Sequence, residues 1–311
     1  MRNFATDQLI LEFLEAMEVE RNNSRLTIRN YHHYLSRFLA WYVNMVGGND
    51  IRELDLDTVR RYRMYLSRFN DAHGKGLSLV TQSYHIIALR SFLKWLVKND
   101  YEVLSPERID LPKAESKSLK FLNEGQVERL MSAPLVGSEP GLRDRAILEV
   151  LFSTGLRVSE LVGLNRDKID FKTREFGVIG KGGRARVVFL SRRAASWLER
   201  YFNAREDKWK PAFIRYSRHR APEYGDGLEM RLTSRTIQRI VDKYRRIAKL
   251  PVEITPHGLR HTFATDLLSH GAGLREVQEM LGHKNIATTQ IYTHVTNPQL
   301  KKVHEKYHSG N

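Results

Sequence analysis

The sequence predicts a mainly α-helical protein of two domains, in which a bundle of four helices precedes an α+β domain with a small antiparallel sheet. A chain of 311 residues suits two domains of roughly 100–200 residues each. Apolar residues recur every three or four positions over most of its length, which is the period of a helix packed on one face. Only residues 168–190 combine short β-prone runs with turn residues.

The first hundred residues predict four helices that form a compact bundle. Acidic residues at 55–57 suit the positive end of the third helix dipole. Either Ser78 or Thr81 can cap the fourth helix. The apolar periodicity that marks the four helices spans residues 9–17, 28–42, 59–69 and 86–96.

A linker is predicted where this periodicity stops, between Asn99 and Leu119. Prolines occur at positions 106 and 112, and residues 113–118 are polar throughout. We therefore expect an N-terminal domain at residues 1–104, a linker at 105–118 and a second domain at 119–311.

The second domain begins with helices and is then interrupted by the predicted sheet. Residues 123–126 can cap one helix, and residues 141–144 begin another. The turn-prone residues Lys181-Gly182-Gly183 separate the last two β-prone runs. Helices dominate beyond Ser191, apart from a basic stretch between Tyr216 and Met230. The three β-prone runs are residues 168–171, 175–179 and 186–190.

The positive charge of the chain is concentrated in the second domain. Residues 1–118 contain 17 lysines and arginines against 15 acidic residues, a net charge of +2, whereas residues 119–311 contain 34 against 21, a net charge of +13. A concentrated positive field attracts polyanions because their condensed counterions are released. This distribution favours binding to nucleic acid, although a solvated basic surface would have the same composition.

Composition also excludes several classes of protein. The absence of cysteine rules out disulfides, thiolate metal sites and a cysteine nucleophile. No stretch approaches the ~20 consecutive apolar residues of a membrane span. The N-terminal residues lack the apolar core and cleavage site of a secretory signal, so we expect a cytoplasmic protein.

Five short motifs follow one another in the second domain, and each would be weak evidence of function by itself. They are TGLRVSEL at 154–161, GKGG at 180–183, HGLRH at 257–261, LGH at 281–283 and YTH at 292–294. In this order and spacing they resemble the tyrosine recombinase family, closest to its Xer-type and phage-integrase-like members. The resemblance covers the second domain motif by motif, but the first domain only in length and helical character.

The resemblance implies an N-terminal SAM-like, core-binding bundle that helps to clamp DNA, and a C-terminal catalytic domain. It implies a site-specific DNA recombinase that cleaves and rejoins DNA through a 3′-phosphotyrosyl intermediate, with Tyr292 as the nucleophile. The partner would be double-stranded DNA with paired half-sites, bound by a homotetramer that exchanges C-terminal tails. No metal, cofactor or ATP is implied. The tail carries apolar residues at helical spacing, namely Leu300, Val303 and Tyr307.

The residue types fit cleavage of a phosphodiester. Charge builds on the non-bridging oxygens in the transition state, and the planar guanidinium groups of Arg157 and Arg260 are suited to stabilise it. His257 and Arg260 follow Pro256 at a predicted helix start, where free N–H groups favour an anion. A phosphotyrosyl ester formed by Tyr292 conserves the energy of the broken bond.

The remaining candidates have roles that the family resemblance implies. His257 would accept the proton of the phenol, Lys181 would protonate the leaving 5′ oxygen, and His283 would either hydrogen-bond the scissile phosphate or support the pocket. Glu160 lies one helical turn after Arg157 and can orient it, although a plain ion pair would look the same. The other histidines of these segments are interpreted as structural or DNA-facing, namely His261, His270 and His294.

Two alternative functions remain open at this stage. A type IB topoisomerase shares the same catalytic residue types, but it acts as a monomer that relaxes supercoils. A DNA-binding or architectural protein could keep the fold without catalysis. The sequence also leaves open whether a recombinase of this kind would resolve replicon dimers in chromosome segregation or move a phage or transposon by integration and excision.

Overall fold

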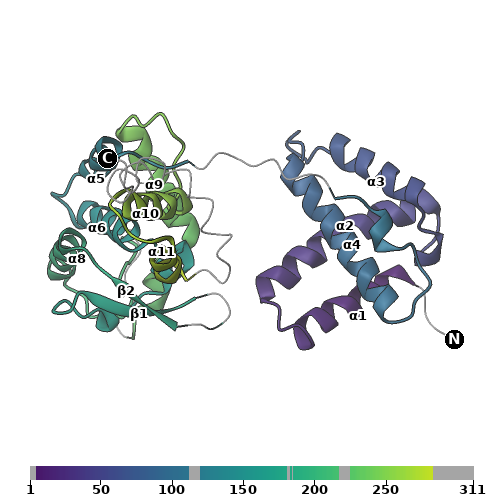
Figure 1. Cartoon of the computed structure of the whole chain (residues 1–311), viewed down its shortest axis with the longest axis horizontal. Helices are drawn as coiled ribbons and strands as arrows, with labels where there is room; N and C mark the ends of the chain where they lie inside the picture. Colours follow the sequence, from purple (N-terminus) through teal and green to yellow (C-terminus); the bar gives the residue numbers. More distant parts are fainter. Residues whose placement is uncertain (1–4, 112–119, 181–182, 184, 217–224, 283–311) are drawn as a thin grey trace, which may run out of the picture. The chain divides into compact units, whose positions relative to one another are not determined.

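A computed structural model describes residues 5–111, 120–180, 183, 185–216 and 225–282. Within these residues the chain forms eleven α-helices and one two-stranded antiparallel sheet, which confirms the predicted mainly helical fold (Figure 1). The chain divides into two compact units, Met1–Ser116 and Lys117–Asn311. No helix of the described part is long and apolar enough to cross a membrane.

The first unit contains the four predicted helices. Asp55 caps the third of them, because its side chain accepts a hydrogen bond from the Thr58 N–H at 2.7 Å. Ser78, rather than Thr81, is the cap of the fourth, and its hydroxyl accepts from the Thr81 N–H at 3.2 Å. The helices are α1 (Thr6–Val19), α2 (Arg25–Val46), α3 (Leu56–Arg68) and α4 (Leu79–Lys98).

Aromatic side chains fill the core of this bundle. The ring centroids of Phe13 and Phe92 lie 5.6 Å apart, and those of Phe38 and Tyr62 lie 5.2 Å apart. The packing continues beyond α4, because Ile109 is buried in the same core. The Arg90 guanidinium also donates to the Pro106 carbonyl at 2.9 Å.

The second unit is built around α6, most of whose residues are buried and which packs against α8 and α10. Asn123 begins the unit's first helix with a capping box, as the sequence predicts, because it exchanges hydrogen bonds with Gln126. The helices are α5 (Glu124–Ser132), α6 (Glu139–Thr154), α7 (Val158–Gly163), α8 (Arg192–Asn203), α9 (Ser234–Ile247), α10 (Pro256–Ser269) and α11 (Leu274–Leu281).

The sheet consists of β1 (Glu175–Ile179) and β2 (Ala185–Phe189), with Glu175 opposite Phe189 and Ile179 opposite Ala185. The first of the three β-prone runs does not form a strand. Its Asp170 makes only a single bridge to Glu175. The Asp170 side chain accepts hydrogen bonds from the N–H groups of Lys172 and Thr173 at 2.7 and 3.2 Å, which turns the chain instead.

Candidate active site

The site begins at a tight turn between α6 and α7. Gly155 ends α6 in the left-handed conformation, with φ +59°. A Cβ atom at this position would lie 2.5 Å from Cδ1 of Phe263 in α10, so glycine also permits the close approach of that helix. The turn leaves Leu156 buried and places Arg157 at the N-cap of α7.

Glu160 holds Arg157 from within the first turn of α7. Its carboxylate accepts the Arg157 N–H at 2.8 Å and pairs with Arg157 Nη1 at 2.9 Å. The Glu160 side chain is 4% exposed, whereas that of Arg157 is 32% exposed. The carboxylate is therefore buried, and the guanidinium that it orients remains accessible to a phosphate.

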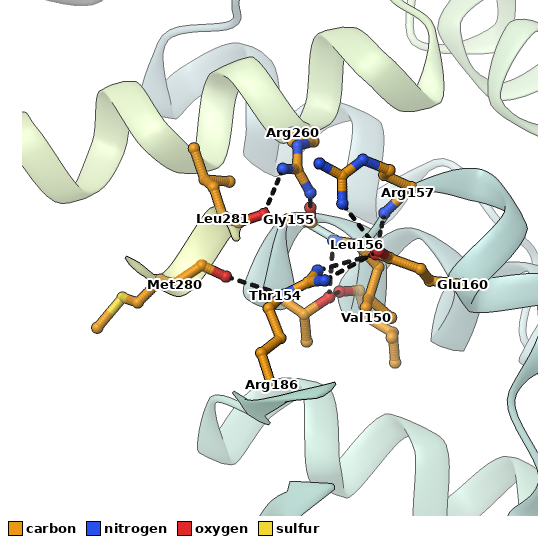
Figure 2. A network of polar contacts seen from close by, with 10 residues as sticks. All are labelled: Val150, Thr154, Gly155, Leu156, Arg157, Glu160, Arg186, Arg260, Met280 and Leu281. Atoms are coloured by element: carbon orange, nitrogen blue, oxygen red, sulfur yellow. Dashed lines mark hydrogen bonds and ion pairs between the residues drawn. The ribbon is translucent and has the colours of Figure 1, made fainter. Parts of the chain in front are cut away.

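Arg186 in β2 is a third member of this network, and the sequence interpretation missed it. Its Nη1 and Nη2 donate to the two oxygens of Glu160 at 2.9 and 2.8 Å, and its Nε donates to the Met280 carbonyl at 3.1 Å (Figure 2). A signal was present, since strand alternation puts Arg186 on the same face as buried Val188. A charged residue on the apolar face of a strand indicates a buried partner.

The two arginines keep Glu160 ionised. Burial by itself would raise the pKa of this carboxyl. Hydrogen bonds from the Arg186 side chain and from the Arg157 backbone outweigh the burial and lower the pKa to about 2. Glu160 is therefore a carboxylate at neutral pH, and its negative charge is shared between two guanidinium groups.

Arg260 lies in the first turns of α10 and is 2% exposed. Its Nη1 donates to the Gly155 carbonyl and its Nη2 to the Leu281 carbonyl, each at 2.6 Å (Figure 2). These carbonyls stand at the ends of α6 and α11, where helices leave acceptors unsatisfied. The same arginine thus ties the turn before Arg157 to the end of α11.

His257 is one helical turn before Arg260 and remains exposed to solvent. Its pKa is lowered by partial desolvation and by the positive charges of Arg260 and Arg157. The His261 ring lies edge to face with it, at a centroid distance of 4.4 Å. Burial and the neighbouring His257 and Arg260 lower the pKa of His261 to about 4. His257 is consequently neutral at pH 7 and able to accept a proton.

Three predicted site residues, Lys181, His283 and Tyr292, lie outside the described residues, as does His294. Their chain neighbours are described. In the sequence, Lys181 lies between the end of β1 at Ile179 and the start of β2 at Ala185, and Gly282 is the C-cap of α11 in the left-handed conformation, with φ +65°. The structure therefore brings Arg157, Glu160, His257 and Arg260 together. His270 lies at the other end of α10, where its Nδ1 donates to the Asp266 carbonyl at 2.8 Å.

Comparison with known proteins identifies the family. Residues 120–298 match the model of the phage integrase family, and residues 10–100 match that of its N-terminal SAM-like domain. The chain belongs to the phage integrase family. The family and fold predicted from the sequence are thereby confirmed.

Several Xer proteins are similar to this family member over almost their whole length. It is 37% identical to tyrosine recombinase XerC of Pelotomaculum thermopropionicum, over 95% of this chain and 96% of that protein. It is 35% identical to tyrosine recombinase XerD of Pseudomonas aeruginosa, over 96% and 97%. The chain is accordingly a Xer-like, site-specific tyrosine recombinase, and neither the topoisomerase nor the non-catalytic alternative is favoured.

Solved structures share the fold of this recombinase. The crystal structure of XerA recombinase is 29% identical, with a TM-score of 0.52 over 98% of this chain and 100% of that one. The Tn1549 transposon integrase in complex with transposon right end DNA is 19% identical, with a TM-score of 0.73 over 97% and 99%. At that identity the second likeness concerns the fold alone.

Proposed function

We propose that this recombinase cleaves a DNA strand by attack of the Tyr292 phenol on the scissile phosphate. A bond forms between the phenolic oxygen and phosphorus, the bond from phosphorus to the 5′ oxygen breaks, and the reverse reaction rejoins the strand. The observation that carries this proposal is the convergence of Arg157, His257 and Arg260 where α6, α10 and α11 meet. Their charges and proton-accepting capacity match the needs of such a transfer.

The two arginines stabilise the negative charge of the transition state. As five-coordinate phosphorus forms, negative charge grows on the non-bridging oxygens, and fixed guanidinium groups stabilise it without reorganising. Arg157 offers an accessible guanidinium whose direction is set by Glu160. Arg260 adds a buried positive charge that cannot move away, because its carbonyl partners belong to two different helices.

Two side chains transfer the protons in this scheme. His257, neutral at pH 7, takes the proton of the phenol, and Lys181 gives one to the leaving 5′ oxygen. His283 donates a hydrogen bond to the phosphate. Because side chains supply every cation and the phosphotyrosyl ester conserves bond energy, the reaction needs neither a metal ion, nor another cofactor, nor ATP.

The assay is covalent capture on a nicked suicide substrate, from which the cleaved fragment diffuses away. The wild-type protein should accumulate a protein–DNA adduct, and Tyr292→Phe should form none, because it lacks the attacking oxygen. Tyr84→Phe, a change at an exposed tyrosine of α4, should leave adduct formation unaltered. An adduct that persists in Tyr292→Phe would show that another residue is the nucleophile.

We further propose that the enzyme works in the cytoplasm as a homotetramer on two duplexes with paired half-sites, its domains at 1–104 and 119–311 clamping the DNA. A groove of about 970 Å³ on the second unit supports exchange of C-terminal tails. Its walls include the apolar side chains of Phe121, Val187 and Phe263. Among its described lining residues, three acids stand against one arginine, namely Glu124, Glu128 and Asp266 against Arg193.

The sequence after Tyr292 complements such a groove. It places Leu300, Val303 and Tyr307 at helical spacing, and lysines at 301, 302 and 306 are interspersed with them. A helix of this pattern would offer an apolar stripe to the groove and positive charge to its acidic rim. Resolution of replicon dimers and movement of a phage or transposon are both consistent with such an assembly. Selection of its binding site from random DNA would define the substrate, and palindromic half-sites around a short spacer would also define the order of cutting.

A further inference from the structure

Arg186 joins three parts of the catalytic unit that each lead to a catalytic group. It belongs to β2, which begins four residues after Lys181 in the sequence. Its guanidinium holds both oxygens of Glu160, which orients Arg157. Its Nε holds the carbonyl of Met280, three residues before His283.

The backbone at the end of α11 leaves room for the Arg186 side chain. Arg186 is only 10% exposed, so its charge must be compensated inside the protein. A Cβ atom at Gly282 would lie 3.1 Å from the Arg186 Cδ, and Gly282 has a positive φ as well. The end of α11 therefore passes close to the Arg186 stem in a conformation that favours glycine.

Arg186 also decides how much positive charge Arg157 presents. A pair of Glu160 and Arg157 alone would be neutral, whereas the trio with Arg186 carries a net charge of +1. Each oxygen of Glu160 accepts one bond from Arg157 and one from Arg186. Without Arg186, the buried carboxylate would have Arg157 as its remaining arginine partner and would compete with the phosphate for its guanidinium.

We propose that Arg186 is a positioning residue for strand cleavage, which acts through Glu160 to aim the Arg157 guanidinium at the scissile phosphate. The inference rests on the proposed function, because it assumes that Arg157 stabilises that phosphate. Outer-shell partners of metal ligands orient those ligands in the same way, and their removal lowers activity by roughly 10- to 100-fold, which sets the size of the effect that we expect here.

The test compares two nicked DNA substrates in single-turnover cleavage. One carries the normal scissile phosphate, and the other carries a methylphosphonate, in which a methyl group replaces one non-bridging oxygen and removes the negative charge. A neutral phosphonate has less need of a guanidinium. We therefore expect Arg186→Met to cleave the phosphate roughly 10- to 100-fold more slowly than wild type, and the deficit to shrink severalfold on either methylphosphonate diastereomer.

Two further variants separate positioning from folding. Arg143→Met breaks a comparably buried ion pair, to Asp144 at 2.7 Å, near the start of α6 and outside the groove lining. It should slow cleavage of both substrates by the same factor, if at all. Arg186→Lys retains the charge without the two-pronged contact and should recover part of the rate on the phosphate. Thermal unfolding of each variant confirms that the folded protein is compared.

The remaining outcomes separate a failure of the inference about Arg186 from a failure of the proposed clamp. If Arg157→Ala is slow on the phosphate but Arg186→Met is not, the inference about Arg186 is wrong and the proposed clamp stands. If Arg186→Met is equally slow on both substrates, Arg186 does not act through Arg157 and the inference is again wrong. If Arg157→Ala cleaves the phosphate normally, the clamp itself is wrong.

Discussion

At the scale of single residues, burial and neighbouring charges decide the protonation states of Glu160 and His257. Glu160 is held ionised by Arg186 and Arg157, and His257 is held neutral by partial desolvation and by Arg260 and Arg157. The site therefore holds both an ionised carboxylate and a neutral imidazole, which are the protonation states that the proposed roles of Glu160 and His257 require. Arg157 contributes to both, whereas burial opposes the ionised form of Glu160 and favours the neutral form of His257.

The lowered pKa of His257 makes a prediction about the pH dependence of cleavage. A base acts in its deprotonated form, and partial desolvation and the nearby arginines disfavour its protonation, so the midpoint of the decline in rate should lie at a lower pH than the ordinary pKa of histidine, ~6.5. Single-turnover rates between pH 4.5 and 8 would measure this limb. His257→Gln should lower the rate roughly 100-fold or more and abolish the limb.

His270 is the matched control for this experiment. It lies at the opposite end of α10 from His257 and is exposed. Its pKa is raised by its hydrogen bond to the Asp266 backbone and by the Asp266 charge. His270→Gln should leave both the rate and the acidic limb as in wild type. A limb that survives in His257→Gln would assign the proton transfer to a different group.

At the scale of elements, helix ends position the candidate catalytic groups. Gly155 is the C-cap of α6, Arg157 is the N-cap of α7 and Gly282 is the C-cap of α11, so three helix termini meet at the network. Cap residues and periodicity are local properties, which explains why the sequence predicts these helices well. The β-prone run at 168–171 was misleading because Asp170 prefers to bond the backbone N–H groups that follow it.

Gly155 provides a prediction at this scale. Gly155→Ala combines a left-handed backbone with overlap against Phe263, and each effect costs about 1–3 kcal/mol. Gly47→Ala is the control, because Gly47 also ends a helix with a positive φ, +76°, but no atom lies within 4 Å of its Cβ. Gly47→Ala should lower the free energy of unfolding by about 1 kcal/mol.

Native-state hydrogen exchange reports the two substitutions separately, in α6 for Gly155 and in α2 for Gly47. We expect the free energy of unfolding to fall further for Gly155→Ala than for Gly47→Ala. Equal losses would mean that the approach of α10 to this turn tolerates a side chain. The rate of adduct formation should also fall in Gly155→Ala, since the turn directs Arg157.

At the scale of the whole molecule, assembly on DNA is the property to test. Deleting the residues after Val295 should leave binding to a single half-site intact but abolish productive synapsis, because the basic, apolar tail segment is lost. Gel-shift titration measures the first and mass photometry of two-duplex complexes measures the second. Unchanged recombination by the truncated protein would show that the tail is not needed for assembly.

A charge exchange tests the acidic groove as the acceptor. Glu124→Lys should weaken synapsis, and combining it with Lys301→Glu and Lys302→Glu should restore part of it. Glu229→Lys, at an acid outside the groove lining, is the control and should have no effect. If the compensating variant does not restore synapsis, the tail binds a surface other than this groove.

The sequence alone determined the helices, the family and the candidates Arg157, His257 and Arg260, because periodicity, caps and motif spacing are written in neighbouring residues. Only the tertiary structure decided that Arg260 is buried between two helix ends and that Arg186 shares Glu160 with Arg157. Those contacts join residues 105 and 26 positions apart. Which distant groups satisfy a buried charge depends on how helices and strands pack, and no local pattern encodes that choice.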